Sequence, residues 1–453
     1  MGLKNYYDKG VILSLVKLGA PVIAGNVGLV LMGLIDNAMV GKLGYVPLAA
    51  AGISNTVFFI ATIFGIGVLM VISASISGEQ TKKDPQTPQI IRAAIVINVL
   101  VSIFTFVVLW ALEHNFHWFG QTTNVQEAAV PYFRIIRYSV WPMFIYLTFK
   151  SVADGHNLTR AAMYATLAAL LLNTFLNWLL IYGNWGFEAY GLVGAGYATM
   201  VSRTFMALFT LFYCMYQPKI KFFWNQIFKP FYKEHVRLLL DLGIPSGGQL
   251  FFEVSAFAGA AIISGWIGEV ELAAHTVAIQ LAALTYMFAS GLSVAGMIQT
   301  GATWAQNKRE ETLAIGRNVT LMTSIFMGCA ALIFVFFRTQ LVSIFAQNDA
   351  VIDLASKLMM LAALFQFFDG LQAVSIGLLR GMNDTKIPSY ITLISYWIVS
   401  LPLAYYFGLY TEMKTIGVWI ALTLALILAS LFLYRRFITL VQTDEIENSL
   451  TDI

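Results

Sequence analysis

The sequence predicts an all-α integral membrane protein with twelve transmembrane helices in two pseudo-symmetric six-helix lobes. Three observations lead to this fold class: an apolar composition, twelve long apolar runs and an internal duplication. Of the 453 residues, 58% are hydrophobic and 11% are charged. So few polar residues cannot cover the surface of a soluble domain, and the composition therefore places the chain in a bilayer.

Charge and cysteine content exclude several other classes. A net charge of +3 is too small to indicate a nucleic-acid partner. Cys214 and Cys329 lie far apart in apolar runs, so they indicate neither a disulfide framework nor a metal site. The apolar run after Lys17 is too long for a cleavable signal, so we expect the first span to remain.

About twenty apolar residues cross a bilayer as a helix. The predicted spans are 14–40, 48–77, 90–112, 128–150, 160–183, 191–214, 238–265, 272–300, 313–336, 352–379, 387–407 and 415–436. They divide the chain into an N-terminal lobe at 1–214 and a C-terminal lobe at 238–453. The cytoplasmic linker between them, 215–237, mixes lysines with aromatic residues and is expected to lie at the membrane interface on anionic lipid, with a regulatory or partner-binding role as the alternative. The short acidic tail from Thr443 to Ile453 is expected to be disordered.

The stretch from Leu18 to Gly67 recurs without a gap at a shift of 224 residues. About a dozen of some fifty positions are identical, and nearly half of these are glycine or proline. The pairs are Leu18/Leu242, Gly19/Gly243, Pro21/Pro245, Val30/Val254, Gly41/Gly265, Gly44/Gly268, Val46/Val270, Leu48/Leu272, Ala49/Ala273, Ala50/Ala274, Phe64/Phe288 and Gly67/Gly291. A weaker echo places Gly155, Asn157 and Thr159 on Gly381, Asn383 and Thr385. Six spans per half is an even number, so the halves are expected to be parallel repeats that meet at the centre of the molecule.

Positive charge is distributed unequally between the two sides of the membrane. Twenty of the 27 Lys and Arg residues, Arg380 among them, fall in loops or at span ends on the side of the N-terminus, and six fall on the other side. The positive-inside rule therefore predicts that both termini are cytoplasmic. Arg203 alone lies well inside a predicted span.

Three carboxylates lie inside predicted spans, where each costs about 2.5–3.5 kcal/mol on insertion scales. Glu253 and Asp369 are expected near the bilayer midplane, and Asp36 lies closer to the outer end of its span. Desolvation favours the neutral form of a buried carboxyl group and a bound cation favours the charged form. These residues are therefore candidates for exchanging a proton with Na⁺. For Glu253 and Asp369 the alternative is a purely structural, hydrogen-bonded role. For Asp36 the alternative is a carboxylate that simply lies near the membrane interface.

Polar side chains on other spans offer further oxygen ligands. Asn173 and Asn177 are four residues apart and share one helix face, and Thr199 could add a hydroxyl group. The alternative for the paired asparagines is interhelical hydrogen bonding without transport. Arg203 could neutralise a carboxylate across the interior or extend toward lipid headgroups, and the sequence does not decide between these.

Pro21 and Pro245 occupy matching positions in the first helix of each half. A proline inside a helix frees a backbone carbonyl group and bends the helix. Both residues are therefore candidate hinges for alternating access. A fixed kink that only shapes the packing is the alternative.

At these residues the chain resembles the multidrug and toxic compound extrusion (MATE) family, and its NorM-like branch in particular. The resemblance runs over nearly the whole chain. The matching motifs are Met32-Gly-Leu-Ile-Asp36 with Gly41-Lys-Leu-Gly44, Leu172-Asn-Thr-Phe-Leu-Asn177-Trp, Phe251-Phe-Glu253-Val, Ala273-Ala-His275, and Gln366-Phe-Phe-Asp369 through Leu379-Arg-Gly381. Members of this family are twelve-helix secondary transporters that exchange Na⁺ or H⁺ for cationic drugs through a cleft between two lobes.

The resemblance implies two cation sites. Asp36, Asn173, Asn177 and Thr199 would form the N-lobe site, and Glu253 with Asp369 would form the C-lobe site. Two positions depart from the family pattern. Phe365 stands where a tyrosine can occur, which removes one possible oxygen ligand. Near the drug contacts, Thr276 stands where a Gln is common and Gln280 stands where an Asn can occur.

The resulting prediction is a multidrug exporter of a bacterial-type inner membrane, without enzymatic activity. It would act as a monomer on cationic lipophilic compounds, coupled to Na⁺ or H⁺ and without another cofactor. Substrate would enter a central cavity near Gln280 and Phe288. The main rival is a lipid-linked saccharide flippase, which would be expected to need a cavity rich in Arg and Lys. An intramembrane enzyme would need a nucleophile with its base, or metal ligands, at depth, and a channel is a poorer fit to two duplicated halves.

Overall fold

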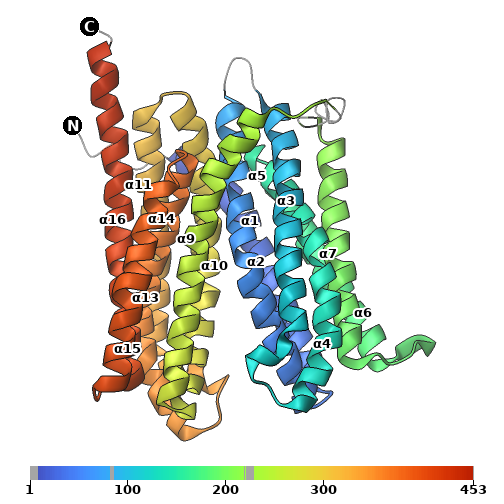
Figure 1. Cartoon of the computed structure of the whole chain (residues 1–453). Coiled ribbons are helices and arrows are strands. Elements are labelled where there is room, and N and C mark those ends of the chain that lie inside the picture. The colour runs from blue at the N-terminus through green and yellow to red at the C-terminus, as the bar shows by residue number, and fades with distance from the viewer. Residues whose placement is uncertain (1–8, 82–85, 219, 221–228, 452–453) are drawn as a thin grey trace. The chain divides into compact units, whose positions relative to one another are not determined.

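The computed structural model describes residues 9–81, 86–218, 220 and 229–451, and every regular element in these ranges is a helix (Figure 1). Eleven segments among the described residues are long and apolar enough to cross a membrane. They match eleven of the twelve predicted spans. The segments are α1 (Lys9–Gly41), α2 (Tyr45–Glu79), α3 (Thr87–His114), α6 (Arg160–Tyr182), α7 (Gly191–Tyr216), α9 (Lys233–Ile267), α10 (Glu269–Ala305), α11 (Arg309–Phe336), α13 (Asp349–Gly381), Lys386–Tyr410 and α16 (Lys414–Thr451).

The remaining predicted span, 128–150, is built from two helices. α4 (Thr123–Tyr138) and α5 (Val140–Gly155) meet at Ser139, and Figure 1 shows them toward opposite ends of the neighbouring helices. Pro142, in the first turn of α5, has no N–H group, so the Tyr138 carbonyl lacks its helical donor. The sequence therefore located this span correctly but missed the break at its centre.

The span Lys386–Tyr410 also departs from a regular α-helix. α14 (Lys386–Leu393) and α15 (Leu401–Tyr410) are joined by a π-helical segment, η4 (Ile394–Ser400). Pro402, two residues after this segment, cannot donate a hydrogen bond to the Ile398 carbonyl, which favours a locally wider turn.

α16 is described as a helix to Thr451, and the last two residues of the tail lie outside the described residues, so the predicted disorder of the tail stays a prediction. Once a helix is nucleated, each further residue adds one hydrogen bond, so a polar sequence can prolong it. Much of the predicted interfacial linker, residues 219 and 221–228, lies outside the described residues, and its role stays a prediction.

The chain divides into two compact units. One contains the described residues up to Ile23 and from Gly248 onward, and the other contains most of Ala24–Gly247. Each unit has its own apolar core, which includes Phe133 and Phe144 in the Ala24–Gly247 unit and Phe365 and Trp419 in the other. Two of the unit boundaries fall inside a helix, in α1 between Ile23 and Ala24 and in α9 between Gly247 and Gly248.

The internal duplication is visible in the backbone. Asn157, after α5, and Asn383, after α13, both adopt a left-handed conformation with a φ of 61°. The N–H group of Asn157 bonds to the Asp154 carbonyl at 2.9 Å, and that of Asn383 bonds to the Arg380 carbonyl at 3.1 Å. Asparagine tolerates this conformation better than most residues, so the repeated Gly-x-Asn pattern encodes the same turn twice.

Glycine 67 allows two helices of the Ala24–Gly247 unit to approach closely. A Cβ atom added to Gly67 in α2 would lie 2.7 Å from Gly247 Cα and 2.7 Å from the Ser246 carbonyl oxygen in α9. Both are backbone atoms, which cannot turn aside as a flexible side chain can. The duplicated glycine, Gly291 in α10, also faces a neighbouring helix within the other unit: the atom nearest to an added Cβ is the side-chain Cγ1 of Ile23 in α1, and the Ile23 backbone nitrogen follows at 3.1 Å.

Replacement of Gly67 by Ala is therefore expected to destabilise the protein, by about 1–3 kcal/mol, because the new methyl group overlaps fixed backbone. Gly52→Ala is the matched control, since Gly52 lies in the same helix and a Cβ atom there meets nothing within 4 Å. Thermal unfolding of the purified variants in detergent measures the difference. Equal unfolding temperatures for the two variants would contradict the close approach.

Candidate ion-binding and substrate sites

The structure brings Asp36 together with two of its predicted partners. Asn177 of α6 donates a hydrogen bond from Nδ2 to Asp36 Oδ1, and Thr199 of α7 donates from Oγ1 to Asp36 Oδ2 at 3.4 Å. Asn173 joins indirectly, because its Oδ1 accepts from Asn177 Nδ2 at 3.1 Å. Three helices thus converge on one carboxylate, and the i, i+4 spacing on α6 aligns both amides toward it.

This cluster has unused oxygen capacity. Asn173 and Asn177 are fully buried, and among the described residues Asn177 Oδ1 has no hydrogen-bond partner. A buried polar atom without a partner is costly in an apolar interior. The Asp36 carboxylate, the Asn177 carbonyl oxygen and the Thr199 hydroxyl are all oxygen donors, the ligand type that a hard cation such as Na⁺ prefers. The donor set therefore fits a small cation.

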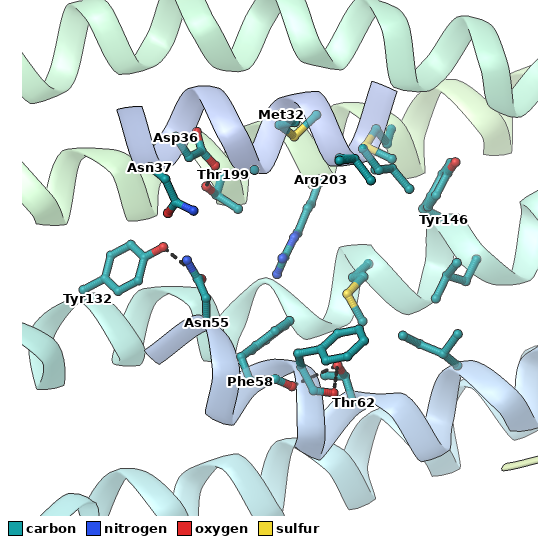
Figure 2. A pocket seen from close by; sticks show the side chains of 18 residues that line it. Met32, Asp36, Asn37, Asn55, Phe58, Thr62, Tyr132, Tyr146, Thr199 and Arg203 are labelled. Atoms are coloured by element: carbon teal, nitrogen blue, oxygen red, sulfur yellow. Dashed lines mark hydrogen bonds between the residues drawn. The ribbon is translucent and has the colours of Figure 1, made fainter. Parts of the chain in front are cut away.

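Asp36 and Thr199 also line a cavity of about 490 Å³ inside the same unit. Figure 2 shows these two residues close together on one wall and Tyr146 far along the cavity. The cavity is mostly apolar, with Met32, Phe58 and Met206 among its walls, and its polar wall residues include Asn37 and Asn55. Tyr132 donates a hydrogen bond to Asn55 Oδ1 at 3.1 Å, which fixes the amide of Asn55.

Arg203 faces the same cavity, which answers the question that the sequence left open. It extends from α7 toward Phe58 (Figure 2), with its Cζ atom 4.6 Å from the centre of the Phe58 ring. Its Nη1 donates a hydrogen bond to Ser139 Oγ at 2.6 Å. Arg203 lies four residues after Thr199, so both side chains project from the same face of α7. Its guanidinium group therefore points into the interior and not toward the lipid headgroups.

Glu253 of α9 and Asp369 of α13 lie in the unit that runs from Gly248 onward, and they interact electrostatically with each other. Both are buried, with 6% of each residue exposed. The Glu253 carboxylate also interacts with Arg380, which donates from Nη2 to Gln249 Oε1 at 3.2 Å. Gln249 precedes Glu253 by one helical turn, so the pattern of α9 places amide and carboxylate on one face.

Sequence reasoning missed the role of Arg380 in this cluster. The sequence analysis counts it among the residues at the span ends, and it does lie in the last turn of α13. Only 5% of it is exposed, however, so it is a buried residue. With two carboxylates and one guanidinium group, the cluster has a formal charge of −1 when all three are ionised. The signal that could have found Arg380 was its spacing from Asp369, about three helical turns along the same helix.

The π-helical segment η4 adds a hydroxyl group near the Glu253 cluster. Tyr396 is fully buried and donates to Gln372 Oε1 at 3.0 Å, and Gln372 lies beside Glu253. Phe365, which replaces the tyrosine that the resemblance allows, packs 5.2 Å from the ring of Trp419. Hence the side chain at position 365 contributes only packing here, while Tyr396 supplies a hydroxyl from another helix.

The remaining predicted residues stand apart from the 490 Å³ cavity. Gln280 and Phe288 lie in α10 and do not line it, and Phe288 stacks on Phe326 with 3.9 Å between ring centres. Their predicted part in a central substrate cavity stays a prediction. Pro21 lies inside α1 and Pro245 inside α9. Each proline is two residues before a boundary between the compact units, at Ile23 and at Gly247.

Comparison with known proteins agrees with this architecture. The MatE family profile matches residues 21–179 and 245–406, and its two matches begin at Pro21 and Pro245, with the spacing of the internal duplication. The chain is 31% identical to the probable multidrug resistance protein NorM of Mesorhizobium japonicum, covering 93% of this chain and 92% of that protein. It is also 31% identical to the multidrug resistance protein NorM of Vibrio cholerae serotype O1, covering 96% of this chain and 97% of that protein.

Solved structures show the same fold. An outward-facing multidrug resistance MATE family transporter of the MOP superfamily superposes with a TM-score of 0.88 at 19% identity, covering 97% of each chain. MATE in complex with MaL6 superposes with a TM-score of 0.86 at 20% identity, covering 97% of this chain and 100% of the other. The predicted fold class, twelve transmembrane helices in two lobes, is thereby confirmed. The resemblance in the motifs is confirmed with it, and this chain belongs to the MatE family.

Proposed function

We propose that this chain is a secondary active multidrug efflux transporter, which exports cationic lipophilic compounds in exchange for Na⁺ or H⁺ by alternating access. The observation that carries the proposal is the Asp36 cluster, where a carboxylate with spare oxygen ligands opens onto a mostly apolar cavity. A site of this kind can bind a coupling cation and an amine-bearing substrate in turn. The relatives named multidrug resistance proteins support the same reading.

The proposed setting follows from the same features. The apolar spans place the protein in a membrane, and relatives from bacteria favour the inner membrane. The excess of Lys and Arg on one side favours cytoplasmic termini. We propose that one chain, embedded in lipid, is the working unit, because each compact unit carries a complete cluster of its own.

The flippase alternative is less well supported. A lipid-linked pyrophosphate would call for several Arg or Lys side chains in the cavity. Arg203 is the basic residue among those that line the described cavity, and it shares that cavity with Asp36. The Glu253 cluster likewise carries more acidic than basic groups.

Ethidium export from inverted membrane vesicles tests the proposed function. A Na⁺ gradient and a pH gradient are imposed separately, each with an ionophore control that collapses it. Gradient-driven export supports the exporter and names its coupling ion. If folded protein is present in the vesicles and neither gradient moves ethidium, the proposed function fails.

Hinges at Pro21 and Pro245 are part of this proposal. Both unit boundaries within a helix lie two residues after one of these prolines. Each proline leaves the carbonyl four residues before it, of Lys17 or Asp241, without its helical donor. A helix with a missing hydrogen bond bends at a lower energetic cost, which suits a hinge.

Pro21→Ala and Pro245→Ala are therefore expected to slow export while leaving thermal stability equal or higher, because alanine restores a helical donor. Pro131→Ala is the matched control, since Pro131 also lies inside a helix but away from both boundaries. Initial export rates and unfolding temperatures are compared for the three variants. Wild-type export rates in Pro21→Ala and Pro245→Ala would reduce both prolines to fixed kinks.

A further inference from the structure

Arg380 stands at one end of a row of buried charges in the unit that runs from Gly248 onward. It lies in the last turn of α13, about 16 Å of helix beyond Asp369. Its Nη2 donates to Gln249 of α9 at 3.2 Å, and Glu253 follows one helical turn further along α9. Because Glu253 interacts with both Arg380 and Asp369, the order of charges along the helices is Arg380, Glu253, Asp369.

The internal duplication shows what is unusual about this arginine. The shift of 226 residues that pairs the two Gly-x-Asn turns places Arg380 on Asp154 of α5. Asp154 is buried and pairs within its own helix, with Lys150 one turn away at 2.7 Å. The position that matches Lys150 is Ile376, which carries no charge. Arg380 therefore takes balancing charge from another helix, and Glu253, a residue of the predicted ion site, supplies it.

The surroundings of Arg380 offer a poor exit for a cation. Its neighbour Gly381 presses α13 against α10, because an added Cβ atom would lie 2.6 Å from the Met297 carbonyl oxygen. Helices packed this closely leave no space for water between their backbones. Asp384, the next acidic residue along the chain, is paired with Arg436 at 2.8 Å. A cation that passed Arg380 would therefore leave two carboxylates and approach a second guanidinium group.

A fixed positive charge repels a mobile cation, and such charges exclude cations from selective pores. The repulsion is strongest where water is excluded. A cation at Glu253 would thus be attracted toward Asp369 and repelled by Arg380. We infer that Arg380 is an electrostatic barrier that stops the coupling cation from leaking past Glu253 toward the end of α13. The cation can then leave only when the transporter changes conformation. This inference rests on the proposed exporter function and adds a residue that keeps its coupling tight.

Cation leak in the absence of substrate tests the barrier. Purified full-length protein is reconstituted into liposomes that contain the pH-sensitive dye pyranine. A potassium diffusion potential, negative inside and set with valinomycin, then draws H⁺ inward, and uptake of radioactive Na⁺ is measured in parallel. Wild type is expected to be nearly as tight as liposomes without protein. Arg380→Gln is expected to admit H⁺ or Na⁺ about tenfold faster than wild type.

Two single variants separate charge from other effects of the substitution. Arg380→Lys keeps the positive charge without the planar guanidinium group, so it is expected to stay tight. Arg435→Gln is the matched control, because Arg435 is an exposed arginine of α16 in the same unit. Its leak is expected to equal that of wild type. The unfolding temperature of every variant is recorded alongside.

Two double variants guard against a folding defect, since Arg380→Gln removes a counter-charge from two buried carboxylates. Each double variant keeps the formal charge of the cluster at −1. Asp369→Asn with Arg380→Gln retains Glu253 and is expected to leak. Glu253→Gln with Arg380→Gln lacks the carboxylate beside the barrier, so it is expected to be tight.

The outcomes separate this inference from the proposed function. Equal leaks in the two double variants would reveal a general loss of packing and overturn the inference. Tight liposomes with folded Arg380→Gln would overturn it too, as would a leak through Arg380→Lys as large as that through Arg380→Gln. In each of these cases, gradient-driven export of ethidium by wild type leaves the exporter standing. If wild type exports no ethidium under either gradient, the proposed function fails and the inference fails with it.

Discussion

Asp36→Asn is expected to reduce gradient-driven export to the background of vesicles without transporter. Asparagine has nearly the same size and can still accept the hydrogen bond that Asn177 donates. It cannot, however, carry the negative charge that attracts a cation or holds an exchangeable proton. The loss should therefore appear in transport and not in folding. Initial rates of ethidium export, together with unfolding temperatures, measure the two effects separately.

Asp353→Asn is a matched control for this substitution. Asp353 is an exposed carboxylate that pairs with Lys357 one helical turn away, at 2.7 Å. Exposed ion pairs of this kind contribute little to stability. Export in this variant is expected to match wild type. Robust gradient-driven export by Asp36→Asn would rule out Asp36 as a coupling residue and leave it a structural hydrogen-bond acceptor.

Glu253→Gln and Asp369→Asn are each expected to abolish coupled export as well, because each removes one of two buried carboxylates. Their effects on stability should differ. When both groups are ionised they repel each other, so Asp369→Asn relieves a repulsion and should leave the unfolding temperature equal or higher. Glu253→Gln relieves the same repulsion but also loses the attraction to Arg380. We therefore expect Glu253→Gln to be the less stable of the two.

Transport and thermal unfolding of these two variants are measured in the same vesicle and detergent preparations. Export by either variant at the wild-type rate would remove that residue from the coupling mechanism. A lower unfolding temperature for Asp369→Asn than for Glu253→Gln would contradict the charge arrangement described for Arg380.

The sequence by itself determined the spans, the duplication and the buried carboxylates. Hydropathy depends on each residue and its near neighbours, so apolar runs predict membrane helices without knowledge of the fold. The duplication is a property of the order of residues, and its Gly-x-Asn echo encodes a local turn that both copies adopt. The turn after Gly155 and the turn after Gly381 could therefore be matched from residues alone. Local chemistry also marked Asp36, Glu253 and Asp369 as costly and hence unusual.

Only the tertiary structure decided which side chains meet. Asp36 and Asn177 are 141 residues apart, and no local pattern specifies their hydrogen bond. The same holds for Arg203 at Ser139, and for Arg380 beside Gln249, 131 residues away. Prolines in the sequence predict hinges or kinks, but a proline alone does not specify whether the helix breaks, as at Ser139, or widens, as at Tyr396. Such long-range contacts depend on the packing of whole helices, which is why the charge partners within each unit could not be predicted from the chain in order.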